Sequence, residues 1–353
     1  MLDHLVLSVT AKCPAACKWC GAESSPRETA RLSREDMVEI IDHVHGYGKL
    51  ESVVFTGGEP LLLEQDLLAA IRHCKSRGLW TRVVSNAFWA NTPERAREVV
   101  DRLMDAGLHE INLSCDDYHQ EFIPLMNVKN ANEACAEAGL PCLLGHKSMK
   151  GCSLTLDKLS GFLGVTLALF DPKSEDNPKN NLVSTGLTVP VQASGMTGIP
   201  DEELLYPQDD MHWMRPCASI LQRVIILPDR RLSICCGMIS RAVPEITFGP
   251  LGERSLEELI IEAHQDLVVN WLAMEGPYGM MQFIRERAPR LRFRQRYVNI
   301  CHLCGEILTR PDCREVLAAH GHEKAAPLGM ERGLYDLLRQ PGFLESDGGG
   351  ASG

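Results

Sequence analysis

Residues 13–20 read Cys13-Pro14-Ala15-Ala16-Cys17-Lys18-Trp19-Cys20, directly after an apolar run from Leu5 to Val9. The C-x₃-C-x₂-C spacing brings three thiolates onto one short loop. An iron–sulfur cube is normally held by four thiolates, so three leave one iron open for another ligand. A structural zinc ion closes its shell with a fourth Cys or His. None follows at zinc-finger spacing, since the next are His43 and Cys74. The spacing therefore favours a cluster over zinc.

The loop resembles that of radical S-adenosylmethionine (SAM) enzymes, in which an aromatic residue, here Trp19, precedes the last cysteine. The resemblance implies a [4Fe–4S] cluster on Cys13, Cys17 and Cys20, whose open iron chelates SAM. Reductive cleavage of SAM then gives a 5′-deoxyadenosyl radical that removes a hydrogen atom from the substrate. We expect Trp19 to lie against the adenine, or else to pack under the loop.

The amino-acid composition of the chain argues against several classes of protein. With 353 residues and 44% hydrophobic content, the chain can bury one large core or two moderate ones. A net charge of −11 argues against a general nucleic-acid or anionic-membrane surface. We find no apolar run of membrane-spanning length and no signal-peptide pattern. Fourteen cysteines without an export signal indicate a reducing compartment, so a cytoplasmic protein is expected.

Residues 4 to about 150 alternate apolar strands with amphipathic helices. Strands are predicted at 5–9, 52–55, 81–84, 110–113 and 142–144. Helices are predicted after the N-cap Ser33, at 65–74, after Thr92-Pro93 and at 131–138. The alternation predicts parallel strands with crossover helices, in a doubly wound sheet or a barrel. The family resemblance implies a partial (β/α)₆ barrel at residues 1–205, with active groups at the carboxyl ends of its strands.

The candidate SAM-binding residues follow these strands. Gly57-Gly58-Glu59 comes after the second strand, and a Gly-Gly pair alone is a common turn. One strand–helix unit after the cysteine loop, it resembles the radical SAM "GGE" motif, which binds the SAM amino group. The resemblance also implies hydrogen bonds to the SAM ribose and carboxylate from residues at the ends of strands three and four, where turn formation is the alternative: Ser85, Asn86, Ser114 and Asp116.

A second cysteine set follows in residues 206–315. Strands at 223–227 and 232–236 form a predicted hairpin, which brings Cys217 and Cys235 together. With Cys301 and Cys304 they supply four thiolates, enough for one cluster or, equally, for zinc. The order resembles the Twitch form of the SPASM module, which implies a small hairpin-plus-helix domain holding one auxiliary [4Fe–4S] cluster. Only Cys313 follows, so a second auxiliary cluster is not expected.

Cys236 neighbours a predicted ligand, and adjacent strand residues face opposite ways. If Cys235 reaches the cluster, Cys236 faces elsewhere, either as a small buried hydrophobe or as a thiol that donates a hydrogen atom. The reverse assignment, with Cys236 as ligand, stays open.

Several segments together resemble radical SAM peptide epimerases of the YydG type over residues 4–310: Thr56-Gly57-Gly58-Glu59, Val84-Ser85-Asn86-Ala87-Phe88-Trp89, Ser114-Cys115-Asp116-Asp117-Tyr118-His119, Cys235-Cys236 and Cys301-His302-Leu303-Cys304-Gly305. Ala87 and Arg230 stand where glycine is expected. The resemblance implies removal of an Hα from a ribosomally made peptide and return of hydrogen by Cys236. Electrons would come from a flavodoxin or ferredoxin. Tyr118 and His119 could orient the peptide or cap a turn.

The chain starts in its barrel without a leader-binding module, so we expect the barrel opening or a strand edge to recognise the peptide. The alternative activity is oxidation of an alcohol or cross-linking of a peptide, with electron transfer to the auxiliary cluster. A non-enzymatic iron–sulfur protein would require that SAM does not bind. Remaining expectations are a strand at 187–191, ligand-side loop character at 194–198, a helix at 332–339 within a 316–353 tail, and core positions for Cys74, Cys135, Cys142 and Cys152.

Overall fold

A computed structural model describes residues 3–17, 20–148, 152–171, 177–187, 206–207, 215–221, 223–235 and 243–338. The strands are β1 (His4–Thr10), β2 (Ser52–Gly57), β3 (Trp80–Ser85), β4 (Glu110–Ser114), β5 (Cys142–Ser148), β6 (Ala168–Leu169), β7 (Leu182–Leu187), β8 (Tyr206–Pro207), β9 (Val224–Ile226), β10 (Leu232–Ser233), β11 (Thr247–Phe248) and β12 (Arg296–Tyr297). The helices are α1 (Arg34–His45), α2 (Glu64–Ser76), α3 (Pro93–Ala106), α4 (Asp117–Gln120), α5 (Leu125–Ala138), α6 (Leu156–Leu163), α7 (Leu256–Gln265), α8 (Leu267–Met274), α9 (Gly276–Arg287), α10 (Ile300–Thr309), α11 (Pro311–His320) and α12 (Ala325–Leu338), with 3₁₀ turns η1 (Pro60–Leu63), η4 (Pro244–Ile246) and η5 (Gly321–Lys324).

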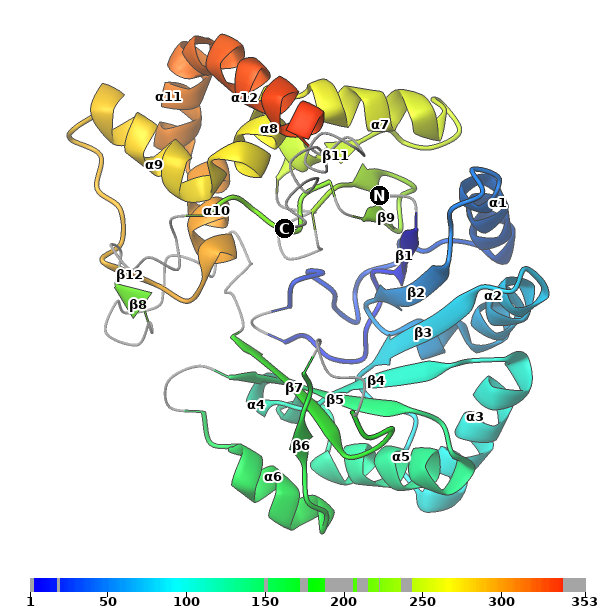
Figure 1. The fold of residues 1–353 in the computed structure, drawn as a ribbon. Helices are drawn as coiled ribbons and strands as arrows, with labels where there is room; N and C mark the ends of the chain where they lie inside the picture. Colours follow the sequence, from blue (N-terminus) through cyan, green and yellow to red (C-terminus); the bar gives the residue numbers. More distant parts are fainter. Residues whose placement is uncertain are drawn as a thin grey trace, which may run out of the picture.

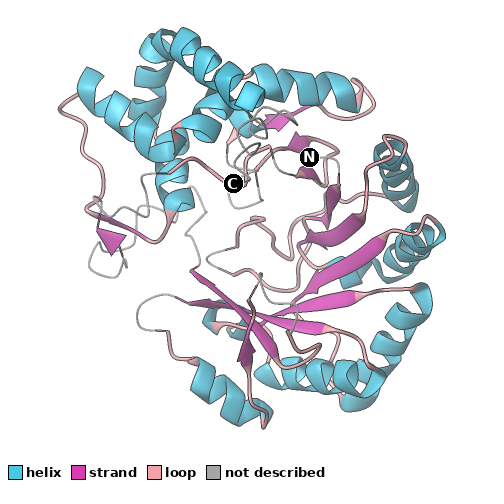
Figure 2. Cartoon of the chain, in the orientation of Figure 1, coloured by secondary structure: helices cyan, strands magenta, loops and turns pink. Residues whose placement is uncertain are grey.

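The first half of the chain forms an open parallel barrel. Neighbours in the order β1-β2-β3-β4-β5-β7 all pair in parallel. Helices α1, α2, α3 and α5 cover the outer side of these strands (Figures 1 and 2). This is the partial (β/α)₆ barrel that the resemblance implied. Its sixth strand, β7, ends at Leu187, where the sequence prediction placed a strand's beginning, and 188–191 lie outside the described residues.

Helix α1 shows how the sequence sets these elements. Ser33 caps the helix and exchanges hydrogen bonds with Asp36 in a capping box, as its pattern predicted. Met37, Ile40 and Ile41 recur at helical spacing and are buried against the sheet. Each fully buried side chain of this kind stabilises the fold by roughly 1.5–3 kcal/mol. The position of α1 beside β1 is therefore fixed by apolar packing and by its cap.

The sheet does not stop at β1. Strand β9 pairs in parallel with β1, with Leu5 opposite Val224 and Leu7 opposite Ile226. Strands β10 and β11 then add antiparallel partners. The predicted hairpin is thus present with shorter strands, and it extends the barrel sheet.

Helices α7 to α12 gather on the hairpin side of the molecule (Figure 1). The predicted helix at 332–339 is the end of the longer α12, and the tail beyond 338 lies outside the described residues. Within the described part of the chain, no helix is long and apolar enough to cross a membrane.

Candidate active site

The cysteine loop leaves β1 at the carboxyl edge of the barrel. Cys13 and Cys17 are buried, Cys20 is half-buried, and all three pack in one small cluster with Ala15 and Tyr118. The loop is held by its own backbone, since the Cys13 amide donates to the Ser25 carbonyl at 3.1 Å. The three predicted ligands therefore lie together. Trp19, the expected adenine contact, lies outside the described residues.

The Cys13 and Cys17 thiols of this loop are poor nucleophiles on their own. Burial raises the pKa of Cys13 and of Cys17 to about 12, and the neighbouring thiols and the Glu59 and Asp116 carboxylates add to the effect. Such thiols stay protonated at neutral pH unless a cation replaces the proton. Three thiols on one loop, two of them with raised pKa values, fit an iron–sulfur cluster with one open iron.

Gly57 and Gly58 allow the end of β2 to pack closely against Thr10 and Lys12, at the start of the cysteine loop. Gly57 has a φ of 127°, and a Cβ there would lie 2.5 Å from the Thr10 carbonyl oxygen. A Cβ on Gly58 would lie 2.1 Å from the Lys12 carbonyl oxygen. The described contacts thus give the two glycines a packing role in addition to the predicted ligand role.

Glu59 is fully buried, and its carboxylate organises the end of β3. It accepts hydrogen bonds from the Ser85 hydroxyl at 2.9 Å and from the Asn86 backbone N–H at 2.8 Å. The Asn86 side-chain oxygen accepts from the Phe88 amide, so its Nδ2 points to Cys13 and donates to Sγ at 3.4 Å. Burial raises the pKa of Glu59 to about 7. Glu59, Ser85 and Asn86 thus form one hydrogen-bond network, which reaches Cys13, a predicted ligand of the iron–sulfur cluster.

The strained residue in this network is Ala87, with a φ of 64°. This left-handed value explains why a glycine is expected there. The Ser85 hydroxyl accepts from the Ala87 amide at 3.1 Å and from the Trp89 indole at 2.9 Å, which holds the turn in place.

The end of β4 supplies the remaining predicted residues. Ser114 is half-buried at the last position of the strand. Asp116 is fully buried and caps α4, because its Oδ1 accepts from the Tyr118 and His119 amides and contacts His119 Nδ1 at 2.8 Å. Its Oδ2 is buried without a hydrogen-bond partner among the described groups. A buried acceptor without a donor costs about 1–3 kcal/mol, so Asp116 suits a ligand that brings a hydroxyl or amino group.

Two residues near this site were not identified from sequence. Cys152, predicted as core, is half-exposed, and its Sγ lies 4.0 Å from the Tyr118 hydroxyl. Asp117 holds the segment there by accepting from the Ser153 and Leu154 amides. His146 is buried near the end of β5, with Nδ1 2.7 Å from the Cys115 carbonyl. Its place at a strand's carboxyl end was the available signal. Cys74, Cys135 and Cys142 are core residues as predicted.

The second cysteine set meets at one cavity. Three chain segments bring its four members together, with Cys301 and Cys304 both on α10. The cavity lining is otherwise apolar: Cys217, Ile220, Cys235, Ile246, Leu272, Pro277, Ile300, Cys301 and Cys304. Four thiols on a carboxylate-free cavity fit a cluster. Among the described residues, no group of three or more Cys, His, Asp or Glu side chains is arranged to hold a metal ion, either at this cavity or at the first cysteine loop.

Two further cysteines complete this account. Cys313 is buried on α11 and is not part of the cavity lining. Cys236, the predicted hydrogen donor, lies outside the described residues.

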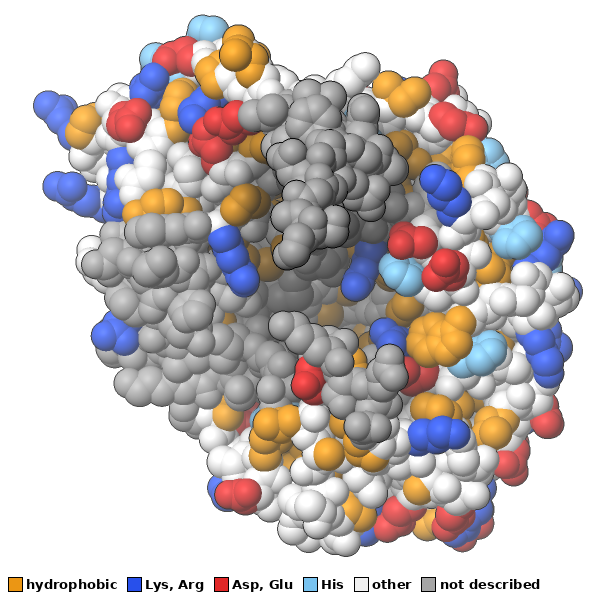
Figure 3. Space-filling model, viewed as in Figure 1, with side chains coloured by type: hydrophobic (Ala, Val, Ile, Leu, Met, Phe, Trp, Pro, Cys, Tyr) orange, Lys and Arg blue, Asp and Glu red, His pale blue; other side chains and the backbone are white. Residues whose placement is uncertain are grey.

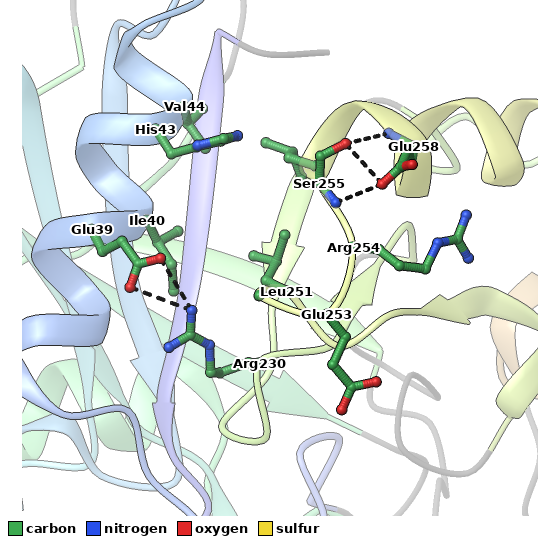
Figure 4. Close-up of a pocket in the computed structure, with 12 residues that line it drawn as sticks. Glu39, Ile40, His43, Val44, Arg230, Leu251, Glu253, Arg254, Ser255 and Glu258 are labelled. Atoms are coloured by element: carbon green, nitrogen blue, oxygen red, sulfur yellow. Dashed lines mark hydrogen bonds and ion pairs between the residues drawn. The ribbon is translucent and has the colours of Figure 1, made fainter.

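A pocket of about 290 Å³ lies between α1 and the turn before α7, and Arg230 lines it (Figure 4). Arg230 sits in the hairpin turn with a φ of 65°, the second place where glycine was expected. Its guanidinium pairs with Asp36 and reaches Glu39 at 3.4 Å, both on α1. Asp36 therefore serves two elements, because it also caps α1. This ion pair ties the hairpin to the barrel.

Comparison with known proteins gives a family for the first half of the chain. Residues 7–146 match the sequence profile of the Radical SAM superfamily. The chain is 22% identical over 319 residues to YydG of Bacillus subtilis, a protein named for peptide biosynthesis, covering 85% of this chain and 90% of that one. It is 32% identical over 117 residues to the PqqA peptide cyclase of Methylocella silvestris, covering 32% of this chain and 29% of that one.

Among solved structures, BtrN in complex with AdoMet and 2-DOIA matches with a TM-score of 0.48 and 11% identity, covering 78% of this chain and 89% of that chain. The profile match spans β1 to β5, the strands whose carboxyl ends carry the cysteine loop, Glu59 and Asp116. Residues 7–146 therefore form a radical SAM domain.

Proposed function

We propose that this radical SAM enzyme modifies a ribosomally made peptide, by converting one L-residue to its D-form. The observation that carries the proposal is the similarity to YydG, which extends over 85% of the chain. PqqA peptide cyclase, a second similar protein, also has a peptide in its name. The domain limits that we propose are 1–205 for the core, 206–315 for the auxiliary module and 316–353 for the tail.

In this proposal the first loop holds a [4Fe–4S] cluster through Cys13, Cys17 and Cys20. A cluster bound there would supply the electron for reductive cleavage of SAM to methionine and a 5′-deoxyadenosyl radical. Asp116 Oδ2, a buried acceptor without a partner, is suited to a SAM hydroxyl or amino group. The other residues proposed to hold SAM are Trp19, Gly57, Gly58, Glu59, Ser85, Asn86 and Ser114.

The proposed epimerisation consists of two hydrogen-atom transfers. The Hα of an L-residue moves to the deoxyadenosyl carbon, which breaks one C–H bond and forms another. The Cys236 thiol then gives a hydrogen atom to the other face of the peptide carbon, and its sulfur becomes a thiyl radical. One electron and one proton restore the thiol, so each turnover takes two electrons from a carrier such as flavodoxin or ferredoxin. Cys217, Cys235, Cys301 and Cys304 would hold an auxiliary [4Fe–4S] cluster beside this strand.

A second candidate is oxidation of an alcohol or cross-linking of a peptide. The apolar four-cysteine cavity favours it, since a cluster there could accept an electron from a substrate radical. The two reactions differ in mass. Epimerisation exchanges one hydrogen with solvent, whereas oxidation or cross-linking removes two.

The test is anaerobic incubation of the reconstituted protein with SAM, dithionite and candidate peptides, read by mass spectrometry and chiral amino-acid analysis. We expect a gain of one dalton in D₂O together with a D-residue. A loss of two daltons in H₂O would support oxidation. Cys236→Ala should still cleave SAM but form no D-residue, and Cys152→Ala is the matched thiol control because it leaves the proposed donor in place. Full epimerisation by Cys236→Ala would refute the donor assignment.

A further inference from the structure

One short segment carries a dense positive charge. Six arginines and one acidic residue occupy the twelve positions 285–296, in a chain whose net charge is −11. The segment comprises the end of α9, the loop after it and the start of β12: Arg285, Arg287, Arg290, Arg292, Arg294 and Arg296. Such a local reversal of sign attracts negatively charged partners to one place on an otherwise repulsive surface.

The segment lies at the outer edge of the helical part, away from the barrel strands (Figure 1). Along the same edge, the space-filling view shows a row of Lys and Arg side chains (Figure 3). Three residues after its end, Asn299 caps α10, the helix that carries Cys301 and Cys304. The positive segment therefore adjoins the second cysteine set.

An anchor holds the loop in shape. Phe293 is buried, with the Arg285 guanidinium 5.6 Å and the Arg310 guanidinium 5.3 Å from its ring centre. Arg310 also donates to the Arg292 carbonyl at 2.8 Å. The charges on either side of Phe293 are thus presented from a fixed backbone, which lowers the entropy cost of docking.

Some of these charges are available to a partner. Arg290 and Arg292 are exposed, and neither they nor Arg285 form an ion pair with an acidic side chain of the described residues. Arg287, in contrast, pairs with Glu323 at 2.5 Å.

We propose that the segment 285–296 is the docking surface for an acidic one-electron carrier protein. The proposal rests on the function proposed above, which needs two electrons per turnover. In each encounter the carrier loses one electron and the enzyme gains one, with no atom transferred. An acidic segment of the peptide substrate is the competing occupant. The position on the outer edge of the helical part, beside the second cysteine set, favours the carrier, because the peptide must reach the strand ends of the barrel.

The test compares a protein reductant with a small one. Formation of 5′-deoxyadenosine is measured with reduced flavodoxin and, separately, with dithionite, for the wild type and for Arg290→Glu/Arg292→Glu. We expect a loss of about tenfold or more with flavodoxin at low salt, a typical size for electrostatic steering, and a change of less than about twofold with dithionite. The loss should shrink as salt rises. Lys49→Glu/Arg72→Glu is the matched control, because it reverses two exposed charges on the barrel.

Several results would overturn the proposal. The first is an equal loss with both reductants. The second is an equal loss in the control variant, or no loss in either variant. The third is a raised KM for the peptide with dithionite, which would assign the surface to the substrate. Wild-type protein that neither flavodoxin nor ferredoxin reduces would also refute it. The dithionite reaction in D₂O reports separately on the proposed epimerisation, so the two failures can be told apart.

Discussion

The two cysteine sets reach their positions in different ways. The first lies in eight consecutive residues after β1, and local backbone contacts such as that from Cys13 to Ser25 hold it. The second comes from three segments spread over residues 217–304 and meets only when α8, α9, α10 and the hairpin have packed. The surroundings differ as well. Glu59 and Asp116 raise the pKa of thiols in the first set, whereas the described lining of the second cavity holds no carboxylate.

The largest effect should follow from breaking the first set. Cys17→Ser removes one of the three proposed cluster ligands, so formation of 5′-deoxyadenosine should fall to background with any reductant. Cys74→Ala, in the core of α2, is the control and should retain it. Substantial SAM cleavage by Cys17→Ser would show that this loop is not the cluster site.

Substituting a cysteine of the second set should abolish peptide modification but leave SAM cleavage intact. Cys304→Ala should lower the iron content from about eight to about four atoms per chain, the value for one cube. SAM cleavage with dithionite should persist while modified peptide is lost. Cys313→Ala, buried outside the cavity, should keep all of the iron. Unchanged iron in Cys304→Ala would mean that the second set holds no cluster.

The buried Glu59 carboxyl beside the first set predicts a pH dependence of stability. The folded pKa of Glu59 is raised to about 7 from 4.5, so the protonated form is the one that the fold favours. Its contribution to stability is complete below about pH 4.5 and is lost as pH rises through 7, by up to about 3 kcal/mol. Denaturation of the metal-free protein at several pH values measures this. Glu59→Gln should flatten that part of the profile, and an unchanged profile would contradict the assignment.

The first cysteine set also receives a side-chain hydrogen bond from Asn86, whose effect on the cluster can be measured separately. The Asn86 amide donates to Cys13 Sγ, and donors to cluster sulfurs raise the reduction potential. Asn86→Ala should therefore lower the potential of the SAM-responsive cluster, and we expect roughly a tenfold smaller ratio of reduced to oxidised cluster, or about 59 mV. A redox titration followed by electron paramagnetic resonance gives the value. Ala87→Gly keeps the donor and relaxes the backbone, so a similar shift there would argue against the hydrogen bond.

The smallest effect concerns the tie between the two regions. Arg230→Ala removes the ion pairs to Asp36 and Glu39, which we expect to lower the free energy of unfolding by about 1 kcal/mol. Hydrogen exchange in the hairpin should rise. Arg231→Ala, which breaks only contacts to Asp229 and Thr247 within the module, should leave exchange in α1 unchanged. Equal behaviour of both variants would show that Arg230 does not link the parts.

The sequence was most informative where the site is local. Thiol spacing, the Ser33 cap and the strand–helix alternation are set by neighbours in the chain, and these predictions of structure agree with the fold. The four cysteines of the second set could be identified from the sequence, but their common cavity could not be located. The cavity depends on helix packing, which the spacing of cysteines along the chain does not determine. Cys152 was misjudged for the same reason, since its contact with Tyr118 joins α4 to the segment after β5. The burial of Glu59, which makes it an organiser of β3, is likewise a tertiary property.

The central claim is that the loop at Cys13, Cys17 and Cys20 leaves one iron open for SAM. Its most direct test is to give SAM and dithionite to the anaerobically reconstituted protein, and to quantify bound metal, methionine and 5′-deoxyadenosine. We expect iron and sulfide in the protein, with methionine and 5′-deoxyadenosine formed in equal amounts. Zinc in place of iron at this loop, or iron-loaded protein that leaves SAM intact under reduction, would contradict it.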